Sequence, residues 1–164
     1  MNSLDSWPSF NPHEILPGLY QGGTDDMDVV MFGTRQRWAD RYPFDVVVTL
    51  YADANPAPWG VEEIRFGFLD SDLSAADASR VIRIARDAYR RWSRGDQILI
   101  RCQAGVNRSG LVSALVLMLD GYSAADAITL LRRKRSPRVL SNRHFESWLR
   151  NDAADLLITT STAV

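Results

Sequence analysis

The sequence predicts an α/β fold in which a mostly parallel central sheet of about four to five strands is flanked by helices. Short runs of β-branched and aromatic residues alternate along the chain with segments whose apolar residues recur at helical spacing. A strongly apolar helical segment at residues 111–119 follows a glycine-containing turn. Because strands alternating with helices favour parallel sheets, we expect a functional loop between a central strand and this buried helix.

Three apolar runs bounded by turn-forming residues predict strands at residues 45–50, 63–66 and 97–101. Residues 19–22 form a weaker strand candidate. The run at 97–101 directly precedes the only cysteine of the chain, so this strand is expected to deliver that residue to the functional loop.

Two helices are predicted in the first half of the chain. Residues 34–42, which end before a proline, predict a short helix in which Trp38 packs rather than binds a ligand. A longer helix is expected to begin at Ser74, because a serine followed three residues later by Asp77 is a typical helix start, and to end at Gly95. Its apolar positions recur at helical spacing at Val81, Ile82, Ala85, Ala88, Tyr89 and Trp92.

Three further helices are predicted towards the C-terminus. The apolar segment 111–119, stopped by Gly121, fits a buried central helix. Ser123 with Asp126 predicts the start of a second helix, which runs to about Lys134. A single last helix is marked by Phe145, Trp148, Leu149 and Leu156.

Length and composition fit one domain at residues 1–158, followed by a loose tail at 159–164. The chain has 164 residues, of which 46% are hydrophobic and 24% charged. A chain of this size and hydrophobic content can bury a full core without disulfide bonds. One cysteine excludes an intramolecular disulfide and leaves no cysteine cluster for zinc. These features fit a reducing compartment, and we expect a cytoplasmic location.

Membrane and nucleic-acid partners are not expected from the charge and hydropathy pattern. The N-terminus has no basic segment followed by an apolar run, and no stretch approaches the roughly 18 apolar residues of a membrane span. A net charge of −1 argues against a nucleic-acid surface over the whole domain. One local basic cluster leaves nucleic acid as an alternative partner, although most clusters of this kind are solvated helix ends. Its members are Arg132, Arg133, Lys134, Arg135 and Arg138.

The segment with the clearest chemistry is Arg-Cys-Gln-Ala-Gly-Val-Asn-Arg-Ser-Gly at residues 101–110. Unpaired amides and the helix dipole favour negative charge where such a loop enters a helix. The same field favours a thiolate and can move a cysteine pKa from about 8.5 to roughly 3.5–7.5. Arg108 can offer a planar fork of donors to two phosphoryl oxygens. The expected phosphate-binding positions are Gln103, Ala104, Gly105, Val106, Asn107 and Arg108.

The pattern Cys102-x5-Arg108-Ser109 resembles the phosphate-binding loop of cysteine-dependent protein tyrosine phosphatases, most closely the small dual-specificity group. The resemblance implies a phosphatase-like fold and activity with no metal or cofactor. It implies that Cys102 attacks phosphorus, that Arg108 and the loop amides hold the phosphoryl oxygens, and that a cysteinyl-phosphate forms. Ser109 is then expected to donate to the sulfur in the second step, and the alternative, compatible role is to satisfy local backbone groups at the helix start. We expect Asn107 to brace the loop.

The resemblance extends beyond the loop to roughly residues 14–150. Residues 18–23 resemble the first strand of that family, 68–72 its acid loop and 140–145 the start of its last helix.

One position departs from the family pattern, which usually has histidine immediately before the cysteine where this chain has Arg101. Arg101 is cationic but cannot reproduce the donor and acceptor roles of a neutral imidazole. The alternative is that Arg101 turns outward at the strand end. We expect a Cys102 pKa that is still depressed but less well defined, and an alkylation midpoint near the ordinary value of about 8.5 would refute this.

The reaction also needs an acid for the leaving oxygen. Asp70 and Asp72 precede Cys102 by 32 and 30 residues, and the family places its acid about thirty residues before the cysteine. Asp70 follows the expected strand end directly, whereas Asp72 lies close to the Ser74 cap. We therefore expect Asp70 to be the general acid, with Asp72 as the alternative.

The expected substrates are phosphorylated proteins that carry phosphotyrosine, with phosphoserine and phosphothreonine as an extension. The loop has no lysine, unlike the phosphoinositide phosphatases of this superfamily. Two alternatives stay open: an RNA 5′-phosphatase of the same superfamily, and a catalytically weak phosphoprotein-binding module in which Arg101 replaces the usual histidine.

Overall fold

The computed structural model describes residues 8–24 and 43–159, and its centre is a single five-stranded sheet. The strand order is β1-β2-β5-β3-β4, and only the β1–β2 pair is antiparallel. The predicted α/β class with a mostly parallel sheet is therefore confirmed. The strands are β1 (His13–Leu16), β2 (Leu19–Gly22), β3 (Val46–Thr49), β4 (Glu62–Arg65) and β5 (Ile98–Arg101).

Strand β5 lies in the middle of the sheet and pairs in parallel with β2 on one side and β3 on the other. Its side chains alternate between two apolar clusters, with Ile98 and Ile100 on one face and Leu99 on the other. The segment that follows Arg101 consequently leaves the sheet at its centre, at the carboxyl edge of three parallel strands, where ligands bind in open α/β sheets.

The sequence analysis placed four of the five strands within two residues of their observed bounds and missed β1. That strand is an edge hairpin partner of β2 between Pro12 and Pro17, and Ile15 is its buried residue. Two prolines and a single buried residue leave no apolar alternation for a sequence pattern to detect.

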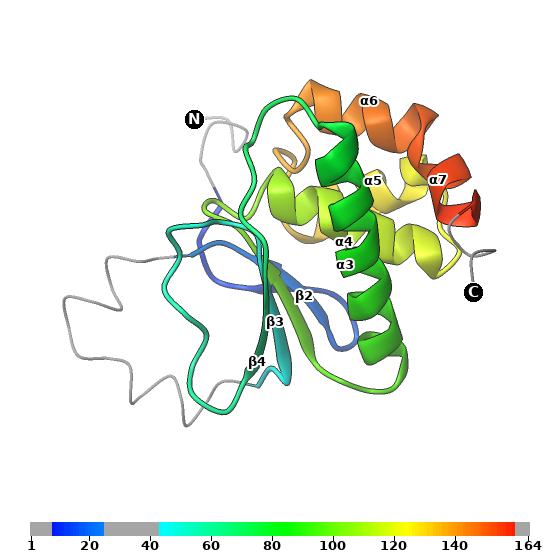
Figure 1. Cartoon of the computed structure of the whole chain (residues 1–164). Coiled ribbons are helices and arrows are strands. Elements are labelled where there is room, and N and C mark those ends of the chain that lie inside the picture. The colour runs from blue at the N-terminus through cyan, green and yellow to red at the C-terminus, as the bar shows by residue number, and fades with distance from the viewer. Residues whose placement is uncertain (1–7, 25–42, 160–164) are drawn as a thin grey trace.

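Five helices belong to the described part of the chain: α3 (Ala75–Ser93), α4 (Arg108–Leu119), α5 (Ala124–Lys134), α6 (Arg143–Asn151) and α7 (Ala153–Thr159). Figure 1 shows α4 between α3 and α5, beside the sheet. None of the described helices is long and apolar enough to cross a membrane. The predicted helix at 34–42, with Trp38, lies outside the described residues.

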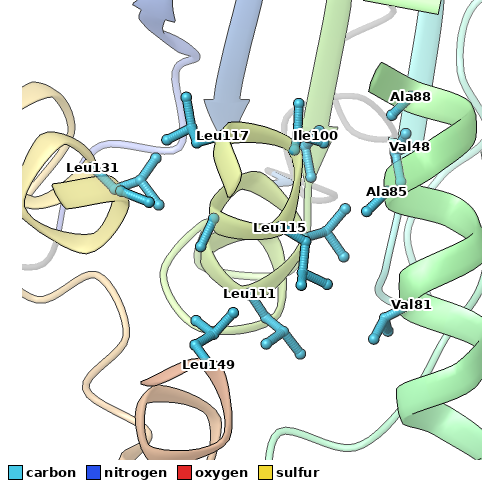
Figure 2. Close-up of a cluster of buried hydrophobic side chains, with 14 of the residues drawn as sticks. Val48, Val81, Ala85, Ala88, Ile100, Leu111, Leu115, Leu117, Leu131 and Leu149 are labelled. Carbon is cyan, nitrogen blue, oxygen red and sulfur yellow. The ribbon is translucent and has the colours of Figure 1, made fainter. Parts of the chain in front are cut away.

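Helix α4 is the predicted buried central helix. Ten of its twelve residues are buried, including the polar pair that opens it. Figure 2 shows Leu111 and Leu115 on the side of α3, with Leu149 of α6 beside Leu111 and Leu131 of α5 on the far side of α4. Each such leucine contributes roughly 1.5–3 kcal/mol by leaving water, so the start of α4 is held firmly in place.

The predicted helix starts are confirmed at two positions. The hydroxyl oxygen of Ser74 accepts a hydrogen bond of 3.1 Å from the amide of Asp77, and that of Ser123 accepts one of 3.0 Å from the amide of Asp126. Each capping serine satisfies an amide that has no partner within its helix.

The single last helix predicted from the sequence is wrong, because the structure divides it at Asp152 into α6 and α7. The break shifts the apolar register, so that Leu157 faces the core and Leu156 is exposed. Thr159 is the last residue of α7, and the rest of the expected tail lies outside the described residues.

Candidate active site

The loop between β5 and α4 brings Cys102 and Ser109 together. Cys102 is 2% exposed, and its Sγ lies 3.4 Å from Oγ of Ser109, the second residue of α4. Ser109 is held in turn by Gln21 on β2, whose Nε2 donates a hydrogen bond of 3.2 Å to the serine hydroxyl. A hydroxyl whose own oxygen accepts from an amide is free to direct its hydrogen towards a sulfur anion.

Arg108 is the first residue of α4 and is 9% exposed. Its Nη1 donates a hydrogen bond of 3.1 Å to the carbonyl of Phe68, and its Cζ lies 5.2 Å from the ring centre of Tyr51. Its Nε is buried with no hydrogen-bond partner among the residues that the structure describes. A buried guanidinium donor without a protein partner is the arrangement expected where an anionic oxygen binds.

Glycine is required at position 105 of the loop. Gly105 has φ of +70°, and a side chain there would clash with Arg135 Nη2 and with the carbonyl carbon of Gly22. The Gly105 carbonyl accepts a hydrogen bond of 3.1 Å from Gln21 Nε2. Gln21 was missed by sequence reasoning, although a glutamine within a predicted buried strand is a recognisable signal of an internal polar contact.

Arg101 points away from the cysteine, but it is not turned out to solvent, because its side chain is only 12% exposed. Side chains alternate along a strand, so Arg101 and Cys102 face opposite sides of the sheet. Arg101 Nε donates to Thr49 Oγ1 at 2.9 Å, and its Nη2 donates to Glu63 Oε1 at 3.2 Å. Burial acts to raise the pKa of Glu63, but the hydrogen bond from Thr49 and the nearby guanidinium groups of Arg65 and Arg101 hold it below its ordinary value. The charge of Arg101 is thus neutralised on the side away from the sulfur.

The two candidate acids have different surroundings. Asp70 is held by two amide side chains: its Oδ2 accepts a hydrogen bond of 3.0 Å from Asn107 Nδ2, and its Oδ1 accepts one of 2.8 Å from Asn142 Nδ2. Asp72 has a side chain that is 83% exposed, and its Oδ1 lies 3.1 Å from His144 Nδ1. Asp70 is therefore tied directly to the cysteine loop, whereas Asp72 is not.

Asn107 links the cysteine loop to the segment that precedes α6. Its Oδ1 accepts hydrogen bonds from the amide of Asn142 at 3.0 Å and from Ser141 Oγ at 3.2 Å. Asn142 also caps α6, because its Oδ1 accepts from the amide of His144 at 3.0 Å. Sequence reasoning did not identify Asn142 as part of this network. An open hollow beside the loop is lined by Asp70, Ser71, Asn107, Ser141, Asn142, Arg143 and His144.

Two arginines of the predicted basic cluster bind other parts of the fold, and one of them, Arg135, is buried. Arg132 pairs with Glu146 at 2.7 Å, and Arg135, at the end of α5, is 7% exposed. Arg133 and Lys134 remain exposed. The expectation of a solvated helix end is therefore wrong for Arg135. The signal was its spacing, because it follows the buried residue Leu131 by four positions and so lies on the apolar face of α5.

Arg135 connects the cysteine loop to the N-terminal part of the chain. Its Nε donates a hydrogen bond of 2.6 Å to the Gly105 carbonyl, and its Nη1 lies 2.7 Å from His13 Nδ1. Burial lowers the pKa of His13, and the nearby charge of Arg135 lowers it further. The ring therefore stays neutral and can accept at Nδ1 from the guanidinium.

A pH dependence of stability follows from this contact. The folded chain binds fewer protons at His13 than the unfolded chain does, between the lowered pKa and the ordinary value of 6.5. We expect the free energy of unfolding to decrease as the pH falls from 6.5 towards the lowered pKa. Urea denaturation at about pH 7.5 and about pH 5.5 measures this change. His13→Gln should reduce the difference between the free energies of unfolding at the two pH values. The control His144→Gln, at an exposed position, should leave that difference unchanged. Equal pH dependence in wild type and His13→Gln would contradict the prediction.

No group of three or more histidine, cysteine or acidic side chains that could hold a metal ion occurs within residues 8–24 and 43–159.

A family model for the dual specificity phosphatase catalytic domain matches residues 70–153, just over half of the chain. The match contains the loop with Cys102 and Arg108 and both candidate acids. The chain belongs to this family of protein tyrosine and dual-specificity phosphatases.

One curated relative and two solved structures are similar to this chain. A relative from Invertebrate iridescent virus 6, named "Putative tyrosine phosphatase 123R", is 27% identical over 147 residues, which cover 84% of this chain and 94% of the relative. The crystal structure of Tk-PTP in the active form is 24% identical with a TM-score of 0.70, covering 92% of this chain and 99% of that one. Human DUSP28 is 22% identical with a TM-score of 0.71, covering 90% and 99%. Both solved structures have the fold described above.

Proposed function

We propose that this chain hydrolyses phosphate monoesters of phosphotyrosine, and of phosphoserine and phosphothreonine, in proteins through a cysteinyl-phosphate intermediate. The observation that carries the proposal is the single loop that places a buried sulfur at Cys102 around one turn from a buried guanidinium nitrogen of Arg108, which has no hydrogen-bond partner among the described residues. We assign this activity to one domain at residues 1–158 in the reducing cytoplasm, where a lone reactive thiol persists.

In the first step, the Cys102 thiolate attacks phosphorus in line with the ester oxygen. The sulfur–phosphorus bond forms as the phosphorus–oxygen bond to the leaving group breaks, and Asp70 gives its proton to the departing oxygen. In the second step, Asp70 takes a proton from water as the water oxygen attacks phosphorus. The sulfur leaves as a thiolate, and the hydroxyl of Ser109, 3.4 Å away, donates to it.

Charge stabilisation comes from Arg108 and the amides of the loop. The transferred group is already anionic, so most of the catalysis is positioning and electrostatic stabilisation of its oxygens. The fork of Arg108 contacts two of these oxygens, and amides of residues 103–107 contact the others. The link between Asp70 and Asn107 supports Asp70 as the acid, because it ties the carboxylate to the loop that holds the phosphate.

Protein substrates are favoured by the loop composition and by the contacts that two arginines of the basic cluster make within the fold. The loop has no lysine to meet the extra phosphates of an inositol ring. Arg132 and Arg135 are engaged within the fold, which weakens the support for an RNA substrate.

Phosphate release in the presence of EDTA tests this proposal. We expect wild-type protein to hydrolyse p-nitrophenyl phosphate and peptides with phosphotyrosine, phosphoserine or phosphothreonine at rates that EDTA does not change. Phosphopeptide binding without hydrolysis would support a binding module instead. Hydrolysis confined to 5′-triphosphate RNA would support an RNA 5′-phosphatase.

A further inference from the structure

We propose that Arg135 is a positioning residue for the phosphatase reaction: it orients the amides of the cysteine loop and supplies the fixed positive charge that Arg101 directs elsewhere. This inference rests on the proposed function, which makes Cys102 the nucleophile. It concerns a residue outside the loop itself, 33 positions after the cysteine in sequence.

Arg135 holds two consecutive carbonyl groups of the loop. Its Nε donates a hydrogen bond of 2.6 Å to the Gly105 carbonyl, and its Nη2 donates one of 3.2 Å to the Ala104 carbonyl. In a planar trans peptide, the carbonyl and the following amide point in opposite directions. The amides of Gly105 and Val106 are therefore turned away from Arg135. Binding the two carbonyls on one side is thus a means of presenting two amides on the other, where the proposed phosphate binds.

The loop and the guanidinium are fitted closely to each other. A side chain at position 105 would clash with Arg135 Nη2 as well as with the Gly22 carbonyl group, so the guanidinium packs directly against the loop at this glycine. Gln21 Nε2 donates to the same Gly105 carbonyl at 3.1 Å, which gives that oxygen two donors from different elements. A carbonyl held twice by buried donors is fixed in direction far better than one facing water.

The partners of Arg135 leave its charge uncompensated by any carboxylate of the described residues. Besides the loop, its donors go to the carbonyls of Ser9 and Asn11, at 2.9 and 3.0 Å, and to His13. These groups are neutral. Burial lowers the pKa of Arg135 to about 10, and the negative charge of Cys102 acts in the opposite direction. A positive charge held against the loop carbonyls favours negative charge bound in the same loop.

The charged and titratable groups around Arg135 and Cys102 come from β1, α4 and α5. His13 on β1 is kept neutral, Arg108 on α4 is directed to the carbonyl of Phe68, and Arg135 ends α5. Arg101 is paired with Glu63 on the opposite side of the sheet. Of these cations, Arg135 is the one that holds the loop carbonyls of Ala104 and Gly105.

Two substitutions separate the charge of Arg135 from its hydrogen bonding. Arg135→Lys keeps the charge and loses the planar fork, whereas Arg135→Gln keeps amide donors and loses the charge. Arg133→Gln, an exposed position on the same helix, is the matched control. The measurement is iodoacetamide alkylation of Cys102, the only cysteine, as a function of pH, because only the thiolate reacts.

We expect the alkylation profile of Arg135→Gln to move to higher pH, with alkylation at about pH 6 at least about fivefold slower than in wild type. Arg135→Lys should keep the wild-type profile but lower kcat about tenfold without a matching change in KM, since one ammonium cannot fix two carbonyls. A purely structural role would lower the melting temperature of both variants and leave the profile unmoved.

Wild-type alkylation profiles in both variants, together with wild-type kcat, would overturn the inference. If Arg135→Gln does not fold, Arg135→Lys decides alone: wild-type kcat in that variant would equally overturn it. Alkylation needs no substrate, so failure of the proposed function, seen as absent wild-type turnover, is distinguishable from failure of the role of Arg135.

Discussion

Cys102→Ser is expected to abolish hydrolysis of phosphate monoesters while leaving phosphopeptide binding intact. A serine hydroxyl ionises far less readily than a thiol, so the nucleophile is lost, and the rate should fall by about 10⁴-fold or more. The substitution removes little volume, and Cys102 is packed beside Ser109 with room for a hydroxyl that can hydrogen-bond. The anion-binding groups, Arg108 and the loop amides, are unchanged.

Two measurements check this prediction. Single-turnover phosphate release with a phosphotyrosine peptide reports the loss of chemistry, and calorimetric titration with the same peptide reports retained binding. The melting temperature controls for folding. Residual turnover within about tenfold of wild type would exclude Cys102 as the nucleophile, because a serine hydroxyl at this position could not attack phosphorus at a rate that close to that of a thiolate.

Asp70→Asn is expected to lower kcat by about 10² to 10⁴-fold on phosphopeptides, the usual contribution of a positioned acid. The loss should be much smaller with p-nitrophenyl phosphate, whose leaving group departs readily without a proton. A merely structural effect would lower both rates alike. The comparison of the two substrates therefore separates proton donation from loop positioning.

Asp72→Asn is the matched control, because Asp72 lies two residues away on the same loop and contacts His144 rather than the cysteine loop. We expect its kcat to stay within about twofold of wild type. An asparagine at position 70 also places an amide against the donor of Asn107 or Asn142, so melting temperatures of both variants must be compared. Loss of activity in Asp72→Asn alone would transfer the acid role to Asp72.

Local patterns in the sequence predicted most of the fold. The helix starts at Ser74 and Ser123 follow from capping chemistry, which needs only residues three positions apart. The central helix α4 follows from its continuous apolar run. Where the pattern was weak, prediction failed: β1 has one buried residue, and the break at Asp152 between α6 and α7 has no glycine or proline to mark it.

By itself, the sequence determined which residues meet in the cysteine loop. Cys102, Arg108 and Ser109 lie within eight consecutive residues between a strand and a helix, so chain geometry alone brings them together. Asp70 and Asp72 could not be separated in this way, because both lie about thirty residues upstream at similar spacing.

Only the tertiary structure distinguished the surroundings of the two aspartates and those of Arg101 and Arg135. Asn107 and Asn142, from different elements, both donate hydrogen bonds to Asp70. Arg101, next to the cysteine in sequence, is turned by strand alternation to Glu63, whereas Arg135 reaches the loop because α5 packs against α4. The strength of an interaction between charges depends on the distance between them in space. For residues far apart in sequence, that distance is set by how the helices pack on the sheet.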